Sequence, residues 1–320
     1  MRTELDRLLS QIHTELGGDV AGRQRQSQQT GEQSPAASEG SPAHTGIAAI
    51  DSQLEATSEE QAGERPVIEL VGLPGCGKTQ IVYRICAAQA RRGHVLLVDA
   101  DGTADMRQLR GCVAQTEPEA GVSALLERIH VFTPDSTSSL VATLAMLPRY
   151  VAQRQIGRVA MVVVEGIGSS NLLIDRKEAS LLRLQIHRAT PWFRQQQVLV
   201  DTLLAVCRDL DCAAIATNTL LFRAQDGRRP RPDEPAERSF TVTGHGQYRD
   251  KMIPRWQSML RQTLVLESQR VGSTTRISFR SVGPAGDSHS QQEAVPSARE
   301  PCTLLIGQPA GQQPQWFATW

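Results

Sequence analysis

The feature that most constrains the fold is a glycine-rich stretch, Gly72-Leu73-Pro74-Gly75-Cys76-Gly77-Lys78-Thr79. It fits the pattern GxxxxGK[ST] in full and lies between a strand-like apolar run, Val67–Val71, and a helix-like segment. The glycines let the backbone curl so that its amides point at a phosphate, and the following helix adds its positive N-terminal end. The stretch therefore predicts a strand, a phosphate loop and a helix in that order, in a protein that binds a nucleotide.

Lysine is rare in this chain, which makes the lysine of the loop conspicuous. Of 34 basic residues only Lys78, Lys177 and Lys251 are lysines. A compact ammonium suits a phosphate cradle where a planar guanidinium would not fit. We expect Lys78 to bridge the β- and γ-phosphates of ATP and the Thr79 hydroxyl to bind Mg²⁺. The predicted nucleotide contacts in the loop are Gly72, Gly75, Cys76, Gly77, Lys78 and Thr79.

Apolar runs and helix-like segments alternate through the middle of the chain. The expected strands are Val67–Gly72, Val95–Asp99, Arg128–Phe132, Val159–Glu165 and Cys212–Thr217. The expected helices are Thr79–Arg91, Asp105–Ala114, Ser138–Gln153 and Pro191–Asp209. Short Val/Ile-rich runs are typical of strands covered on both faces. The alternation predicts an α/β fold with a mostly parallel sheet wrapped by helices.

The C-terminal part adds an antiparallel extension to this sheet. Gln262–Ser268 and Thr274–Arg280 are expected to pair at the sheet edge, and Thr303–Ile306 to return to that edge. The predicted organisation is a short helix over 1–16, a flexible linker over 17–64, a core over 65–282, a polar insert over 283–300, and a C-terminal strand and tail over 301–320. No separate N-terminal domain is expected beyond the short helix.

Composition excludes several classes of protein. The 34 basic and 34 acidic residues balance, so the chain is not one that coats nucleic acid by bulk charge. No apolar run approaches the roughly 18 residues that a membrane span needs, and we expect no membrane partner. The six cysteines form no CxxC pair and no cluster with zinc spacing. A reduced intracellular protein is the expected setting.

Acidic residues at the ends of two expected strands are candidates for the catalytic site. Glu165 ends an apolar strand where an aspartate usually holds the Mg²⁺ shell, although any strand end is a solvated position that suits an acidic residue. Asp99 and Asp101 follow another strand, and alternation points both to one side, with Asp101 closer to the crevice. We predict Asp101 and Glu165 as catalytic residues, and Thr79 and Glu165 as metal ligands. A helix-capping role for Asp101 near Asp105 is equally consistent.

The order of these motifs resembles that of RecA-type recombinases. Thr45–Asp51 resembles their TG…LD segment, the phosphate loop continues into Gln80 as in eukaryotic strand-exchange recombinases, and Ala216-Thr217-Asn218 stands where they carry a Thr-Asn-Gln sensor. The chain is most similar to the short recombinase paralogues, over about 65–307 with large gaps. The stretches that carry this are Val98–Asp101, Asp105–Arg107, Ser136–Leu147, Tyr248–Gln257 and Leu304–Gly307.

The resemblance implies a RecA-like P-loop NTPase core in homologous-recombination DNA repair in the nucleus. It implies a mediator that works in a complex with other paralogues and helps to load the main recombinase on single-stranded DNA. It adds Gln80 and Asn218 to the nucleotide contacts. Three departures matter: Thr219 replaces the γ-phosphate-sensing glutamine, Glu165 replaces aspartate, and the 17–65 segment has no Phe-x-x-Ala hook. These departures argue for slow turnover and against a self-assembled filament.

An arginine-rich stretch follows the Thr-Asn strand, where the resemblance implies a mobile loop that meets DNA. The loop spans about 222–249, and its candidate DNA contacts are Arg223, Arg228, Arg229 and Arg231. Arginine contacts phosphates and stacks on bases. The nearby Asp233, Glu234 and Glu237 cancel much of this charge, so a solvated loop is an equal alternative. The basic residues after Glu165, such as Arg183 and Arg194, fit the polar face of a helix better than a second DNA loop.

Two other functions are consistent with the same residues. The first is a nucleotide-binding scaffold subunit without significant hydrolysis, which Thr219 and Glu165 favour. The second is a small-molecule kinase, because similar phosphate loops occur in that class. A kinase would need an arginine-rich lid, which the 222–249 loop could imitate, but the C-terminal antiparallel extension argues against it. Any enzymatic activity is expected to be a weak, DNA-stimulated ATPase.

Overall fold

The computed structural model describes residues 45, 47, 50–51, 66–115, 118–168, 191–222, 239–242, 246–249, 252–271, 274–282, 303–307 and 315–319. All of them lie in one compact unit, Pro42–Trp320. The expected N-terminal helix, most of the linker and the polar insert at 283–300 lie outside the described residues. Among the helices that are described, none is long and apolar enough to span a membrane.

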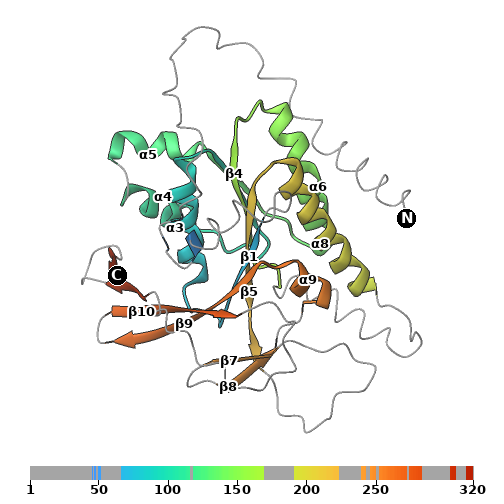
Figure 1. The fold of residues 1–320 in the computed structure, drawn as a ribbon. Helices are drawn as coiled ribbons and strands as arrows, with labels where there is room; N and C mark the ends of the chain where they lie inside the picture. The colour runs from blue at the N-terminus through green and yellow to red at the C-terminus, as the bar shows by residue number, and fades with distance from the viewer. Residues whose placement is uncertain are drawn as a thin grey trace, which may run out of the picture. The chain divides into compact units, whose positions relative to one another are not determined.

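A nine-stranded sheet forms the centre of this unit, in the order β12-β11-β10-β9-β1-β5-β4-β2-β3 (Figure 1). Its parallel part consists of β1 (Val67–Gly72), β2 (His94–Asp99), β3 (Ile129–Phe132), β4 (Val159–Glu165), β5 (Ala213–Thr219) and β9 (Gln262–Val271). Its antiparallel part adds β10 (Thr274–Val282), β11 (Thr303–Gly307) and β12 (Gln315–Thr319). The structure thus confirms a mostly parallel sheet with a C-terminal antiparallel extension.

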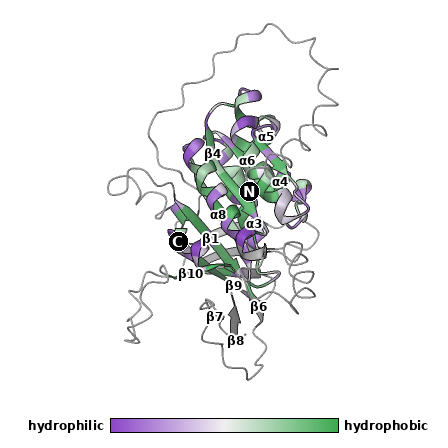
Figure 2. Ribbon diagram, turned by 90° about the vertical axis from the view of Figure 1, so that its right-hand side faces the viewer, coloured by the Kyte–Doolittle hydropathy of each residue, from purple (hydrophilic) through white to green (hydrophobic). Residues whose placement is uncertain are grey.

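Helices cover both faces of the sheet, because the strand side chains alternate between two apolar clusters. One cluster joins the sheet to α3 (Lys78–Ala90), α4 (Met106–Ala114) and α5 (Glu119–Leu126). The other joins it to α6 (Thr137–Gln153), α8 (Pro191–Asp209) and α9 (Pro254–Met259). Ile68 and Leu70 face the first cluster, and Val67 faces the second. Hydrophobic residues accordingly line the strands, with hydrophilic positions along the helices (Figure 2).

Polar caps set the starts of two helices. Asp105 Oδ1 accepts hydrogen bonds from the backbone N–H groups of Arg107 at 2.8 Å and Gln108 at 3.4 Å, and α4 begins at the next residue. Ser136 Oγ accepts from Ser139 N at 3.1 Å at the start of α6. Such caps satisfy amide donors that the first helical turn leaves without a partner. The expected helices therefore begin within two residues of their observed starts.

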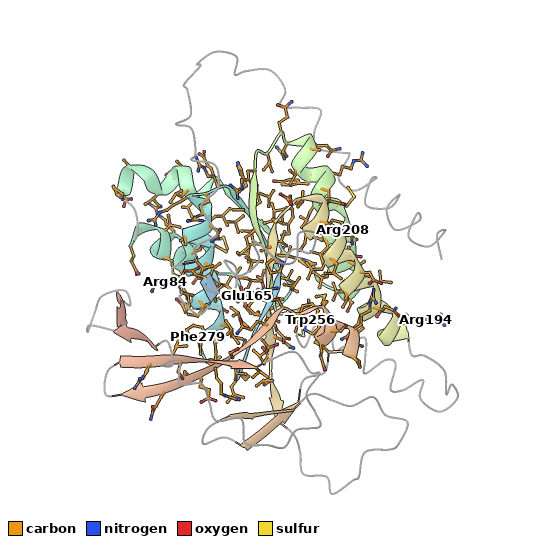
Figure 3. All side chains as sticks on the ribbon, viewed as in Figure 1. Arg84, Glu165, Arg194, Arg208, Trp256 and Phe279 are labelled. Carbon is orange, nitrogen blue, oxygen red and sulfur yellow. The ribbon has the colours of Figure 1, made fainter. Side chains whose placement is uncertain are left out.

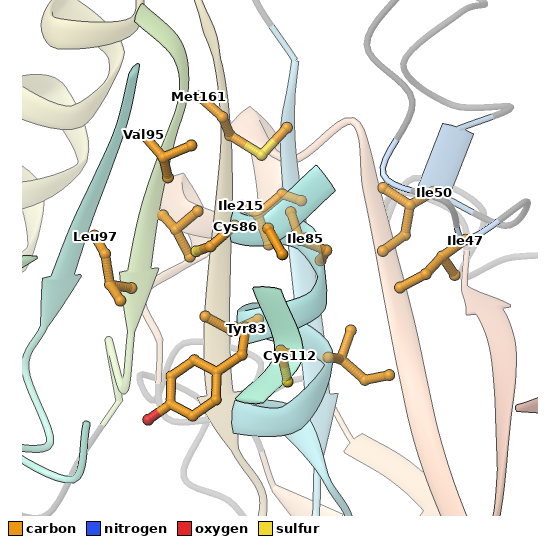
Figure 4. Packing of buried hydrophobic residues seen from close by; sticks show 14 of the residues in the cluster. Ile47, Ile50, Tyr83, Ile85, Cys86, Val95, Leu97, Cys112, Met161 and Ile215 are labelled. Atoms are coloured by element: carbon orange, nitrogen blue, oxygen red, sulfur yellow. The ribbon is translucent and has the colours of Figure 1, made fainter. Parts of the chain in front are cut away.

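The segment before the first core strand folds onto the core. The Asp51 carboxylate accepts a hydrogen bond from Thr45 Oγ1 at 2.8 Å and a second from the Thr45 backbone N–H. This pairing turns Ile47 and Ile50 inward, where 2% and 0% of each residue remains exposed. Figure 4 shows both side chains beside the residues that pack α3 against the sheet. The TG…LD segment therefore closes one side of the core.

Several elements differ from the sequence prediction. Helices α5 and α9 and strand β12 are present but were not expected. The predicted 222–249 loop is not wholly irregular, because β6 (Leu221–Phe222), β8 (Gly246–Arg249) and β7 (Ser239–Val242) form a separate antiparallel sheet in the order β6-β8-β7. The Ser-Phe-Thr-Val run has the β-branched and aromatic content that favours a strand, but at four residues it is too short to stand out in the polar segment around it.

Candidate nucleotide site

The phosphate loop joins β1, which ends at Gly72, to α3, which begins at Lys78. Gly75 and Gly77 have φ angles of 77° and 95°, which favour glycine over residues with a Cβ atom. Space is also short: a Cβ on Gly77 would lie 2.6 Å from Ile277 Cδ1, and one on Gly72 would lie 2.4 Å from Cys76 Sγ. Strand β10 packs against the loop at Gly77, and β9 packs against it at Gly72, where a Cβ would lie 3.0 Å from the Leu266 carbonyl oxygen. Glycine thus suits the backbone curl at Gly75 and Gly77 and the close contacts at Gly72 and Gly77.

Lys78 lies over the loop that it belongs to. Its Nζ donates hydrogen bonds to the carbonyl oxygens of Gly72 and Leu73, both at 3.0 Å. Burial lowers the pKa of Lys78, and the charges of Cys76, Asp101 and Glu165 oppose that effect. The ammonium is therefore held at the loop by neutral carbonyls and lies near two carboxylates, where a phosphate would be a stronger acceptor.

Two acidic side chains end adjacent parallel strands beside this lysine. Asp99 and Glu165 are register partners on β2 and β4, and they are 1% and 2% exposed. Glu165 lies in the interior near the middle of the molecule (Figure 3). The pKa of Glu165 is raised to about 7: burial is the main cause, the charges of Asp99 and Asp101 add to it, and a hydrogen bond with the Thr79 side chain and the charge of Lys78 oppose it. The loop and the strand ends therefore meet at one polar site.

Each of these acids has one carboxylate oxygen without a hydrogen-bond partner among the described residues. These atoms are Asp99 Oδ1 and Glu165 Oε2, whereas Asp99 Oδ2 accepts from the Ala104 backbone N–H at 2.7 Å. A buried oxygen of this kind is costly unless something binds it. The part of the chain that the structure describes has no group of three or more His, Cys, Asp or Glu side chains with metal spacing. The hydroxyl of Thr79 with one or two carboxylates nevertheless fits Mg²⁺, which takes few protein ligands and completes its shell with phosphate oxygens.

Asp101 lies at the same site and is not a helix cap, because Asp105 caps α4. Its carboxyl group packs against Gly166, just after β4: a Cβ there would lie 2.2 Å from Asp101 Cγ. Gly166 has a φ of 76°. The Tyr83 hydroxyl accepts a hydrogen bond from the Asp105 backbone N–H at 2.6 Å, and burial raises the pKa of Tyr83 to about 12. Tyr83 therefore ties the 99–105 segment to α3, a role that its place in an apolar helix pattern did not reveal.

Asn218 lies near the carboxyl end of β5 and is bonded to a residue that the sequence analysis missed. Its Nδ2 donates to Glu69 Oε1 at 3.0 Å, and its Oδ1 faces Gly168, where a Cβ would lie 2.2 Å from it. The neighbouring Thr219 is the register partner of Gly72. Glu69 had one sequence signal, an acidic residue inside the apolar strand Val-Ile-Glu-Leu-Val.

The structure therefore brings together most of the predicted site residues. Glu165 interacts with Lys78, Thr79 and Asp101, and Cys76 is a buried residue of the loop. The Gln80 side chain instead donates a hydrogen bond to Gln108 on α4. The four candidate DNA contacts, Arg223, Arg228, Arg229 and Arg231, lie outside the described residues. Arg194 lies exposed near the start of α8 (Figure 3).

The strand order, the phosphate loop after β1 and the acids at the carboxyl ends of β2 and β4 define an α/β RecA-like core. No family model matches the chain. It is similar to DNA repair protein RAD51 homolog 4 of Mus musculus, with 31% identity over 198 residues, 59% of this chain and 54% of that protein. The same protein of Bos taurus is 29% identical over 194 residues, 58% of this chain and 54% of that protein. The chain thus spans about half the length of the curated relatives it matches.

Proposed function

We propose that this chain is an ATP-binding recombinase paralogue that acts as a mediator in homologous-recombination DNA repair. The observation that carries the proposal is the meeting of Lys78, Thr79 and Glu165 at the phosphate loop. The similarity to DNA repair protein RAD51 homolog 4 supplies the biological setting. Other recombinase paralogues are the proposed partners, and the nucleus is the proposed location.

In this proposal the phosphates of ATP lie in the loop amides. Lys78 exchanges its two carbonyl partners for phosphate oxygens, and Thr79 and Glu165 hold Mg²⁺. Bound Mg²⁺ neutralises the charge that develops on the phosphates. The Asp101 carboxylate, which packs against Gly166, acts as the general base and accepts a proton from the attacking water. Glu165 has to lose its proton before it binds the ion, because its pKa is raised to about 7.

That last point favours a second candidate, a nucleotide-binding scaffold with little hydrolysis. A glutamate that is half protonated near neutral pH binds Mg²⁺ more weakly than an ionised aspartate, so turnover is slow. Single-stranded DNA is a further proposed ligand, through Arg223, Arg228, Arg229 and Arg231, and would stimulate whatever ATPase activity exists. A kinase is the weaker alternative, since it has no support in the similarity to a DNA repair protein.

The proposal names a class of paralogue rather than one member. Short stretches such as Arg255-Trp256-Gln257 resemble X-ray-repair cross-complementing protein two, whereas the mouse and bovine relatives reported above are both RAD51 homolog 4. Two members of one group are therefore indicated. A pull-down from nuclear extract with mass spectrometry tests the class: recovery of recombinase paralogues supports it, and recovery of a metabolic complex in their place contradicts it.

Nucleotide binding is tested with a fluorescent ATP analogue and Mg²⁺. Lys78→Ala is expected to abolish measurable binding, because it removes the only side-chain cation that the described loop supplies to the phosphates. Arg110→Ala is the matched control, since that exposed cation pairs with Glu119 on α5. Equal affinities of the two variants would contradict the proposed site, provided that both keep the unfolding temperature of the unchanged protein.

A further inference from the structure

Glu69 is a fully buried acidic residue in the strand that leads into the phosphate loop, with 0% of its surface exposed. It accepts hydrogen bonds from three elements far apart in the sequence: from Asn218 Nδ2 on β5 at 3.0 Å, from Trp256 Nε1 on α9 at 2.8 Å, and from Thr263 Oγ1 on β9 at 3.1 Å. A carboxyl group in an apolar core is costly, whereas an aliphatic residue would fill the same space at no such cost. This arrangement indicates a role beyond filling the core.

The three bonds are not divided equally between the two carboxylate oxygens. Asn218 and Trp256 both donate to Oε1, and Thr263 donates to Oε2. Two donors on one oxygen compete for the same electron density, so a change at one of them is felt by the other. Asn218 lies at the nucleotide end of β5, and Trp256, labelled in Figure 3, is a fully buried side chain of the apolar cluster that joins the sheet to α6, α8 and α9. Glu69 therefore connects the nucleotide end of the sheet to α9.

Glu69 also decides which way the Asn218 amide faces. A primary amide has a donor end and an acceptor end, and phosphate oxygens accept hydrogen bonds only from the donor end. With its nitrogen on Glu69, Asn218 turns its oxygen toward Gly168; the flipped amide would place two acceptors, Asn218 Oδ1 and Glu69 Oε1, against each other. A nitrogen fixed in this way presents its second N–H in a defined direction.

We infer that Glu69 is a positioning residue of the nucleotide site, which orients the Asn218 amide toward the γ-phosphate and couples that contact to Trp256. The inference rests on the proposed function, together with the nucleotide contact that the resemblance to the recombinases implies for Asn218. It predicts that the preference for a nucleoside triphosphate over a diphosphate depends on Glu69, although Glu69 itself does not touch the nucleotide. It also predicts that Trp256 responds to the γ-phosphate.

The first test compares the affinities of fluorescent ATPγS and ADP. Glu69→Leu removes both acceptor oxygens at similar volume, and Asn218→Ala removes the side chain that they orient. Each is expected to lower the ratio of ATPγS affinity to ADP affinity about tenfold, the value of one charge-assisted hydrogen bond. The double variant is expected to lower it no further, because the two residues act as one unit. A Glu69→Leu protein that stays folded and keeps the ratio, or a double variant with a further tenfold loss, would overturn the inference.

Two variants separate positioning from a loss of stability. Thr263→Val removes the donor on the other oxygen and is expected to leave the ratio unchanged. Glu69→Gln keeps one acceptor oxygen for Asn218 and Trp256, and its new N–H₂ group can donate to the Thr263 hydroxyl. This variant is therefore expected to keep the affinity ratio of the unchanged protein. A ratio that falls equally in Thr263→Val would indicate a merely structural carboxylate and contradict the inference.

The second test does not require Glu69→Leu to fold. Replacing Trp192, Trp316 and Trp320 with Phe leaves Trp256 as the only indole. Its emission is expected to change with ATPγS but not with ADP, and Asn218→Ala is expected to remove the difference. An emission change that persists in Asn218→Ala would refute the coupling. If the unchanged protein binds neither nucleotide, the proposed function fails; if it binds both and the variants change nothing, the inference about Glu69 alone fails.

Discussion

The central strands have two chemically different ends. At the carboxyl ends of β2 and β4, Asp99 and Glu165 each keep a buried carboxylate oxygen that no described residue bonds. At the amino ends of β2 and β3, a hydrogen-bonded series joins His94 Nδ1 to His130 Nε2 at 3.0 Å and His130 Nδ1 to the Tyr150 hydroxyl at 3.0 Å. Both ends carry half-buried or buried titratable groups. Among these, the histidines at the amino ends hydrogen-bond to neighbouring side chains, whereas the two acids at the carboxyl ends each keep an unpaired oxygen.

The difference separates a structural cluster from a ligand site. The His94 and His130 rings stack with centroids 5.2 Å apart, and Tyr150 packs edge-on against His130 and Phe132. Every polar atom that this series uses finds its partner within the fold, as expected of side chains that only hold helices and strands together. The carboxylate oxygens that stay unpaired at the carboxyl ends, near Lys78 and Thr79, are atoms that a bound cation would contact.

The largest expected effect comes from adding one methyl group at the carboxyl end, and the same change at the amino end serves as its control. Gly77→Ala at the carboxyl end forces a residue with a Cβ atom to a φ of 95° and places that atom 2.6 Å from Ile277 Cδ1. We expect a loss of about 1–3 kcal/mol in the free energy of unfolding and a complete loss of ATP binding. Gly157→Ala, just before the amino end of β4, has no atom within 4 Å of its Cβ. It is expected to leave both unchanged.

Thermal unfolding and titration with a fluorescent ATP analogue measure these two variants side by side. If Gly157→Ala weakens nucleotide binding as much as Gly77→Ala does, the claim that only the carboxyl ends bind the nucleotide is wrong.

The second effect is a dependence on pH that Glu165 imposes on the carboxyl end. Its pKa is raised from an ordinary value of 4.5 to about 7, so the folded state holds a proton that the unfolded state has released. Stability of the nucleotide-free protein therefore falls as the pH rises from about 4.5 to 7, by on the order of 3 kcal/mol. Mg²⁺–ATP requires the ionised form, so its affinity is expected to rise about tenfold between pH 6 and pH 8.

Glu165→Gln removes the titrating group at nearly the same volume. Both slopes, that of the unfolding free energy and that of nucleotide affinity, are expected to flatten in this variant. Protonation of the nucleotide itself affects the two proteins equally, so the difference between their slopes isolates Glu165. Slopes that persist in Glu165→Gln would assign the titration to another group and contradict this account.

The sequence predicted the parts of the fold that depend on local pattern. Apolar runs of Val and Ile located β1 and β4 to the residue, and Pro191 located the start of α8. Helix α9 was missed because it has only six residues, too few for a helical period to show. Strand β7 was missed because it has only four residues, too few for an alternating pattern to show.

The candidate site divides in the same way. The phosphate loop is contiguous in the sequence, so its pattern predicted Lys78 and Thr79 directly. Glu69, Asn218, Trp256 and Thr263 are joined only by folding, across as many as 194 positions of the chain. Their contacts depend on which strands lie side by side, and β1 lies between β5 and β9 in an order that the chain does not follow. No local pattern encodes that order, although the lone acid in the middle of β1 was a signal that something polar had to meet it.

The smallest expected effect is a dependence on pH of the opposite sign, at the amino ends. Burial lowers the pKa of His94 and His130, and the charges of Arg128 and Arg154 and the two rings' proximity add to this. Both rings cannot be protonated together without two N–H groups facing each other across 3.0 Å. The contribution of this cluster to stability is therefore fully present above about pH 6.5, the ordinary pKa of histidine, and is lost as the pH falls below that value through the lowered pKa values of the folded state.

His94→Gln keeps a hydrogen-bonding side chain that does not titrate. Because the rings are partly exposed, the change is expected to be small: the acid-induced loss of unfolding free energy between pH 7 and pH 5 becomes shallower, with nucleotide affinity unaffected at pH 8. Urea unfolding at the two pH values, combined with the Glu165→Gln series, separates the slopes. If His94→Gln alters nucleotide affinity at pH 8, the two ends of β2 are energetically linked, and the amino end is more than a structural cluster.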